Sequence, residues 1–187
     1  MGLVHIYFGN GKGKTSAAAG IAIRAAGQGM RVHFIQFMKG GNSGEINILR
    51  QIDGITVLRC SRSYNFTANM NQYEQEQITK EHNTFLKTAL KILESEDMII
   101  LDEFFSAYNY GLCDKSLAQK LVTNENRHSE IILTGHDPDS FFLQRSDYIS
   151  EIKAVKHPFE KGITARRGID VYKRQIQLFL VKKEMGV

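Results

Sequence analysis

The chain has 187 residues, enough for one domain with a buried core, and its 42% apolar and 24% charged residues are typical of a globular protein. The net charge is +4, but residues 171–187 hold four basic side chains against one acidic side chain, a net of +3 that leaves +1 for the rest. A near-neutral chain with no basic stripe and no apolar run of about 18 residues argues against a nucleic-acid or membrane partner.

The start of the chain and its two cysteines bear on where the protein works. Leu3 already belongs to the first apolar run, so we expect no signal peptide. Cys60 and Cys113 show neither metal-ligand nor redox spacing, which predicts buried thiols rather than a disulfide. These features indicate a cytoplasmic protein.

Apolar, β-branched runs recur along the chain and are separated by helical or loop segments. Strands are expected at Val4–Phe8, Val32–Phe37, Ile55–Arg59, Met98–Leu101 and Ile131–Leu133, with a candidate sixth at Tyr148–Ile152. Alternating strands and helices imply right-handed crossovers, so we predict a three-layer α/β fold around a mostly parallel sheet.

Helices are predicted between these strands. The first begins at about Ala17, and the longest covers roughly residues 72–94 with one apolar face. Asp114 is a plausible N-cap for another helix, and a short helix near Pro138 has Asp137 as its candidate cap.

A glycine-rich segment joins the first strand to the first helix. Such a turn lets backbone N–H groups converge on phosphate oxygens at a helix N-terminus, while a lysine adds charge and a threonine hydroxyl can bind Mg²⁺. The usual spacing G-x-x-x-x-G-K-[ST] would place its first glycine at Phe8, so this loop is one residue short. The segment reads Gly9, Asn10, Gly11, Lys12, Gly13, Lys14, Thr15 and Ser16.

Two carboxylates, Asp102 and Glu103, end the apolar strand that begins at Met98. In phosphate-loop proteins, a carboxylate at this point meets the metal ion that the threonine of the loop also contacts. The alternative is a strand that becomes polar where it leaves the core. Together with the glycine-rich loop, the carboxylates favour a metal site whose ligands are Thr15 and Asp102, Glu103 or both.

Other candidate residues follow the remaining strands and should face the same ligand, because ligands bind beyond the carboxyl ends of parallel strands. Lys39 and Glu45 suit an anionic or hydroxyl-bearing ligand, or belong to a flexible loop with a solvated lysine. Tyr64 and Phe66 form an aromatic wall against a flat apolar ligand, or pack on the domain. His136 bonds a phosphate or ribose oxygen, or caps its turn.

Taken together, these motifs resemble the corrinoid adenosyltransferases of the phosphate-loop type. The short loop of that family, G-N-G-K-G-K-T, matches Gly9–Thr15 and accounts for the missing residue. The resemblance covers about residues 3–170. It continues through Arg24-Ala25, Gly27–Gly29, Gln36–Gly40, Gly44-Glu45, Leu101–Glu103, Thr134-Gly135, Val155–Phe159, Gly162–Ala165 and Gly168–Asp170.

The resemblance implies a P-loop NTPase (RecA-like) fold and a homodimeric enzyme of cobalamin biosynthesis, of the cob(I)yrinic acid a,c-diamide adenosyltransferase type. A Co(I) corrinoid would attack C5′ of ATP and release triphosphate, with Mg²⁺ or Mn²⁺ bound and a flavoprotein supplying electrons. Lys14, Thr15 and Glu103 would act in catalysis. The whole loop, Lys14 and Thr15 included, would bind the substrates together with Lys39, Glu45 and His136. Tyr64 and Phe66 would contact the corrin, although relatives often have Trp where this chain has Phe66 and arginine where it has His136.

The sequence leaves two alternative functions open. One is a phosphate-loop ATPase or nucleotide kinase that has the same short loop, and the other is a non-catalytic nucleotide-binding regulator. For the chain as a whole, we expect a single domain over residues 1–170. The sequence Asp170–Gln175 is what the end of a common sequencing adapter would encode in frame, so we expect the basic tail 171–187 to be non-native.

Overall fold

The computed structural model describes residues 1–41, 43–64, 70–163, 166, 168 and 169. The chain divides into two compact units, residues 1–153 and residues 154–187. The first unit contains the sheet and every α-helix found in the described residues. In the second unit, the described part contains one 3-10 helix, η2 (Pro158–Lys161). Phe66 and the tail 171–187 lie outside the described residues.

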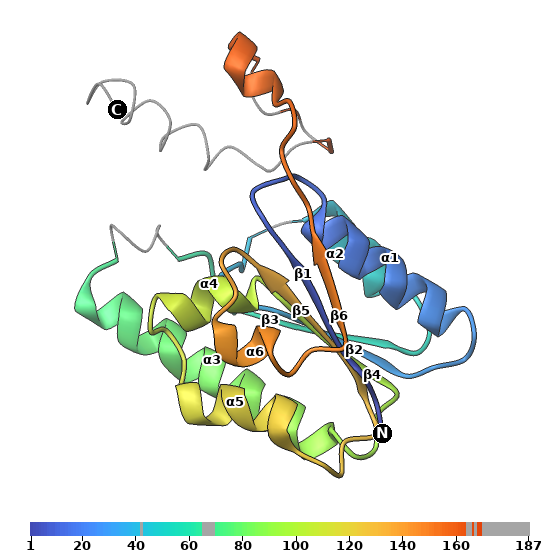
Figure 1. Cartoon of the computed structure of the whole chain (residues 1–187). Coiled ribbons are helices and arrows are strands. Elements are labelled where there is room, and N and C mark those ends of the chain that lie inside the picture. The colour runs from blue at the N-terminus through green and yellow to red at the C-terminus, as the bar shows by residue number, and fades with distance from the viewer. Residues whose placement is uncertain (42, 65–69, 164–165, 167, 170–187) are drawn as a thin grey trace. The chain divides into compact units, whose positions relative to one another are not determined.

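A six-stranded parallel sheet forms the centre of the first unit (Figure 1). Its order is β3-β2-β4-β5-β1-β6, and each pair of neighbours is parallel. All carboxyl ends therefore lie at one edge. The strands are β1 (Val4–Phe8), β2 (Val32–Gln36), β3 (Ile55–Arg59), β4 (Met98–Asp102), β5 (Glu130–Gly135) and β6 (Tyr148–Glu151).

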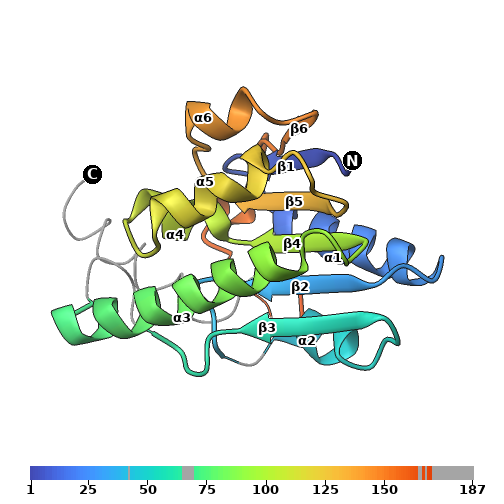
Figure 2. The same ribbon diagram turned by 90° about the horizontal axis from the view of Figure 1, so that it is seen from below.

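Helices cover both faces of this sheet, which gives three layers (Figure 2). On one face, the alanines of α1 (Lys14–Ala26) and the apolar residues of α2 (Gly44–Leu49) pack on Phe34 and Ile100. The other face carries the larger apolar cluster, which includes Ile35, Phe37 and Leu101. Its helices are α3 (Gln72–Ile92), α4 (Phe104–Asn109), α5 (Lys115–Thr123) and α6 (Ser140–Leu143).

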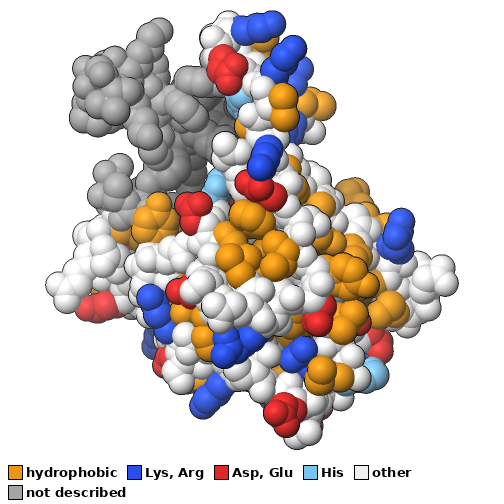
Figure 3. Space-filling view, in the orientation of Figure 1, with side chains coloured by type: hydrophobic (Ala, Val, Ile, Leu, Met, Phe, Trp, Pro, Cys, Tyr) orange, Lys and Arg blue, Asp and Glu red, His pale blue; other side chains and the backbone are white. Residues whose placement is uncertain are grey.

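The predicted three-layer α/β architecture is confirmed, and so is the sixth strand. β6 is an edge strand whose four residues are all exposed, among them the apolar Tyr148 and Ile149. Exposed hydrophobic side chains gather near the middle of the face shown in Figure 3. None of the helices in the described residues is both long and apolar enough to cross a membrane.

Of the two predicted helix caps, one is observed and the other is not. Asp114 caps α5 as expected, because its side chain accepts hydrogen bonds from the backbone N–H groups of Ser116 and Leu117. Asp137 is not the cap of α6, and that prediction was wrong. Asp139 takes this role and accepts from Phe141 N at 2.8 Å, while Asp137 adopts a left-handed backbone with φ 46°. The six-residue helices α2 and α4 were not predicted.

Candidate active site

The loop between β1 and α1 is held tightly against the end of β6. Gly9 and Gly13 have φ values of 112° and 115°, which favour glycine. Gly11 donates its N–H to Ile152 O at 2.7 Å. A Cβ on Gly11 would lie 2.7 Å from that oxygen, so the loop shape requires the absence of a side chain there.

Substituting Gly11 by alanine is therefore expected to weaken ATP binding about tenfold, because a Cβ 2.7 Å from Ile152 O is closer than van der Waals contact and the loop must shift to relieve the clash. Gly20→Ala in α1 is the matched control, since nothing lies within 4 Å of a Cβ at Gly20. That control should bind ATP normally and gain about 0.5–1 kcal/mol of stability. Titration with ATP and urea unfolding measure the two effects. Equal affinities for the two variants would contradict the steric argument.

Lys14, the first residue of α1, folds back onto its own loop. Its Nζ donates to Gly9 O at 2.7 Å and to Gly11 O at 2.9 Å. The side chain is buried, and this burial lowers the pKa of Lys14 although Glu103 opposes the shift. A buried ammonium group at the mouth of a glycine loop is suited to exchange these carbonyls for phosphate oxygens.

Asp102 lies at the centre of the site and is fully buried at the end of β4. The hydroxyl of Thr15 donates to its Oδ1 at 2.9 Å. Gln36 Nε2 donates to Oδ2 at 3.0 Å, and Thr134 Oγ1 donates to Oδ1 at 2.8 Å. Asp102 thus connects the loop to strands β2 and β5.

Glu103 follows in a left-handed conformation, with φ 58° and ψ 25°, which costs a non-glycine residue about 1–2 kcal/mol. Several contacts compensate this cost. Its N–H donates to Thr134 Oγ1 at 3.0 Å, and its carboxylate accepts from Ser106 Oγ at 3.0 Å and pairs with Lys39 Nζ at 3.1 Å. Burial opposes ionisation, but the charge of Lys39 and the hydrogen bonds from Lys39 and Ser106 together outweigh it and hold the pKa of Glu103 below its usual value.

Lys39 is thereby placed in the same site as the loop. Its Nζ also lies 3.9 Å from Asp102 Oδ2. Burial disfavours its charge, but Glu103 and Asp102 together raise the pKa of Lys39. The solvated-lysine alternative does not describe this residue, because its ammonium group is paired with Glu103.

The remaining predicted residues are spread around this centre. Asn10, Lys12 and Ser16 are exposed on and beside the loop. Glu45 is exposed in the first turn of α2, from where its charge acts on Lys39. Their roles remain predictions.

His136 and Tyr64 differ in their exposure to solvent. His136 is exposed after β5, and its pKa is lowered by partial burial and by the charge of Lys14. Tyr64 is 3% exposed and belongs to the core cluster that contains Phe37. Tyr64 therefore packs on the domain, as in the second of the two interpretations of this residue.

The sequence analysis did not single out the contacts made by Gln36, Thr134 and His82. Gln36 lies directly opposite Asp102 in the β2–β4 register, and Thr134 ends the neighbouring strand β5. Polar residues at the ends of apolar strands were the available signal for both. His82 is a buried residue of α3 and gave no such signal.

His82 supports the turn that carries Lys39. Its Nδ1 lies 2.8 Å from Leu112 O, and its Nε2 lies 3.1 Å from Met38 N. Because the carbonyl accepts and the amide donates, the neutral tautomer with hydrogen on Nδ1 satisfies both contacts. Burial lowers the pKa of His82 to about 4. His82 thus holds Met38, whose φ is 62°, against α3.

This buried neutral histidine predicts a pH dependence of stability. An unfolded histidine binds its proton near pH 6.5, whereas folded His82 does so only near its pKa of about 4. Its contribution is fully present above pH 6.5 and is lost as the pH falls toward 4. Urea unfolding should show a loss of about 2 kcal/mol between pH 7 and pH 5 that His82→Gln lacks. Identical pH profiles for the two proteins would contradict this role.

The fold and these contacts together define a class of protein. A parallel α/β sheet with a glycine-rich loop between β1 and α1, and an aspartate on β4 bonded to the threonine of that loop, is consistent with a P-loop NTPase-like fold. Residues 1–171 match the model of the family described as ATP:corrinoid adenosyltransferase BtuR/CobO/CobP, and the chain belongs to this family.

Individual relatives agree with this assignment. A protein named corrinoid adenosyltransferase from Escherichia coli strain K12 is 35% identical over 175 residues, covering 90% of this chain and 85% of that protein. Corrinoid adenosyltransferase CobA of Salmonella typhimurium strain LT2 is 31% identical over 179 residues, with coverages of 90% and 85%. A corrinoid adenosyltransferase of Pseudomonas aeruginosa is 30% identical over 175 residues, with coverages of 90% and 83%.

Proposed function

We propose that this protein transfers the 5′-deoxyadenosyl group of ATP to the Co(I) centre of a corrinoid and releases inorganic triphosphate. The observation that carries the proposal is the convergence of Lys14, Thr15 and Asp102 at the carboxyl edge of the sheet, in a chain of the adenosyltransferase family. The names of the relatives point to the same activity.

The residues of the site suit a reaction in which the leaving group carries the charge. An electron pair of Co(I) forms the bond to C5′ while the C5′–O bond breaks, and the triphosphate leaves with the electron pair of that bond. No proton has to be removed from the nucleophile, so no general base is required. The role of the protein is to position ATP and to neutralise the triphosphate, through Lys14 and the N–H groups of the loop.

For a divalent cation, Mg²⁺ or Mn²⁺, we propose Thr15 and Asp102 as the protein side of the site. The Thr15 hydroxyl and the Asp102 carboxylate are 2.9 Å apart, and Mg²⁺ is commonly held by one or two protein oxygens together with substrate phosphates. Glu103 is less suited as a direct ligand, because it is paired with Lys39. The ion would neutralise charge on the triphosphate when bound.

Finer features of the activity rest on the resemblance. We propose a corrinoid of the cob(I)yrinic acid a,c-diamide type, a flavoprotein electron donor, a homodimer and a cytoplasmic location. For the corrin contact we propose Phe66, with Tyr64 anchoring the segment before it in the core, because Tyr64 is buried.

Product analysis tests the proposed function. The protein is incubated with Mg-ATP, a corrinoid and a strong reductant, and the products are separated. We expect triphosphate together with a light-sensitive adenosylated corrinoid, formed in equal amounts. ADP and phosphate formed without dependence on the corrinoid would instead identify an ATPase or kinase. Nucleotide binding without turnover would identify a regulator.

A further inference from the structure

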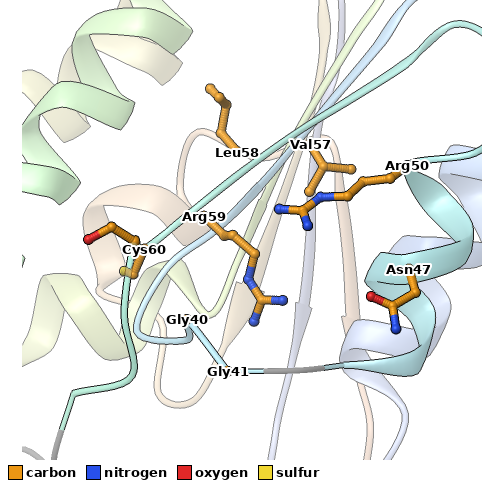
Figure 4. Close-up of a pocket in the computed structure, with 9 residues that line it drawn as sticks. Gly40, Gly41, Asn47, Arg50, Val57, Leu58, Arg59 and Cys60 are labelled. Atoms are coloured by element: carbon orange, nitrogen blue, oxygen red, sulfur yellow. The ribbon is translucent and has the colours of Figure 1, made fainter.

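A pocket lies beside the segment that follows Lys39, between the edge strand β3 and helix α2 (Figure 4). Its volume is about 410 Å³. Gly40 and Gly41 line it from the β2–α2 connection, Arg50 lines it from the end of α2, and Arg59 lines it from the end of β3. The site described above does not use this pocket.

Two guanidinium groups dominate the charge of the pocket. Figure 4 shows Arg50 and Arg59 extending from opposite sides into the space between β3 and α2. Within the described ranges, with 42 and 65–69 left out, no carboxylate lies within 4.0 Å of either group. Burial and the neighbouring charge of Arg50 both lower the pKa of Arg59, while Glu45 opposes this shift without forming an ion pair. Two like charges therefore share one pocket.

The backbone on the Lys39 side of the pocket packs closely against the segment that follows β3. A Cβ on Gly40 would lie 1.8 Å from Arg62 O and 2.9 Å from Cys60 O, so the two segments are in direct backbone contact. The N–H groups of Gly40 and Gly41 donate to no acceptor among the described residues. The pocket thus combines two cations with a glycine segment that brings no side chain into it.

We propose that Arg50 and Arg59 bind an oxyanion, a carboxylate or a phosphate group, in this pocket. The planar guanidinium fork matches both kinds of oxyanion with paired hydrogen bonds, and a bound anion relieves the repulsion between the two arginines. Two sources fit this chemistry: a free phosphate, and a carboxylate at the edge of the corrinoid. The second source rests on the proposed function.

The pocket and the catalytic site contact opposite ends of one residue. Arg59 Nε lies 3.5 Å from Lys39 O, whereas Lys39 Nζ lies 3.1 Å from Glu103. An anion that reorients Arg59 would therefore change the hydrogen bond to the backbone of Lys39, the residue whose side chain lies in the proposed nucleotide site.

The first experiment measures binding of inorganic phosphate to the full chain by calorimetry, with Mg-ATP present to occupy the loop. We expect Arg50→Gln and Arg59→Gln each to weaken phosphate binding about tenfold, the loss of one charge-assisted contact. Arg145→Gln is the matched control, because it removes the same charge just before β6, at the opposite edge of the sheet. Arg50 is exposed, so its variant should fold even if Arg59→Gln does not. No corrinoid or reductant is needed, so this result can be interpreted even if the proposed adenosyl transfer is wrong.

The second experiment compares KM for a corrinoid with peripheral carboxylates and for one with amides at the same places. A rise in KM of about tenfold in the two arginine variants, for the carboxylate form alone, assigns the pocket to the corrinoid. Weaker phosphate binding with unchanged KM values assigns it to free phosphate. Unchanged phosphate affinity and unchanged KM in both variants would overturn the proposal.

Discussion

Replacing Lys14 by alanine is expected to lower the rate of adenosyl transfer by about a thousandfold. The ammonium group of Lys14 is buried beside the carbonyls of Gly9 and Gly11, at the mouth of the loop where the triphosphate would lie. Removing a buried charge that stabilises a developing anion costs about 10²–10³ in rate, and Lys14 also contributes to ATP binding. Single-turnover assays with chemically reduced corrinoid measure this loss without interference from electron supply.

The design of this test must separate charge from folding. Lys14→Met keeps the apolar stem of the side chain and loses the ammonium group, so it should be as inactive as Lys14→Ala and better packed. Lys120→Ala, on the exposed side of α5, removes a lysine away from the site and should retain full activity. Full activity of Lys14→Met would rule out the assignment of the glycine segment as the triphosphate site.

Asp102→Asn is expected to reduce both stability and turnover. Three side-chain donors, from Thr15, Gln36 and Thr134, converge on this fully buried carboxylate. An amide presents an NH₂ group to some of these donors, which leaves a buried donor unpaired at a cost of about 1–3 kcal/mol. Loss of the negative charge should also weaken Mg²⁺ binding, and the rate of turnover should fall by about a hundredfold or more.

Urea unfolding and a titration of activity with Mg²⁺ measure the two effects of Asp102→Asn separately. Asp53→Asn makes the same chemical change at an exposed position and should alter neither quantity. A variant with unchanged stability would show that the three hydrogen bonds do not hold the site together. An unchanged Mg²⁺ dependence would show that Asp102 is not the metal ligand and would favour Glu103 in that role.

The sequence predicted those parts of the site that depend on local order along the chain. The glycine loop, Lys14 and Thr15 form a contiguous motif, and Asp102 is marked by the apolar strand before it. The roles of Gln36 and Thr134 depend on strand order, because β4 lies between β2 and β5 in the sheet but not in the chain. No periodicity in a single sequence reports that order.

Other features escaped prediction for different physical reasons. His82 lies within the apolar face of α3, and its partner Met38 is 44 residues away. The helices α2 and α4 have six residues each, which is too short for a clear helical period. Asp137 and Asp139 are both suitable capping residues two positions apart, so composition alone could not choose between them.

The wide spacing of the residues around Asp102 has a consequence for the life of the protein in the cell. Gln36 and Thr134 are 66 and 32 residues from Asp102 along the chain, on three adjacent strands. The centre of the site therefore exists only when β2, β4 and β5 are paired in register. A nucleotide that binds only this state stabilises it by about 2.7 kcal/mol at a hundredfold excess over Kd. The supply of nucleotide would thus set how often partly folded chains are exposed to proteases.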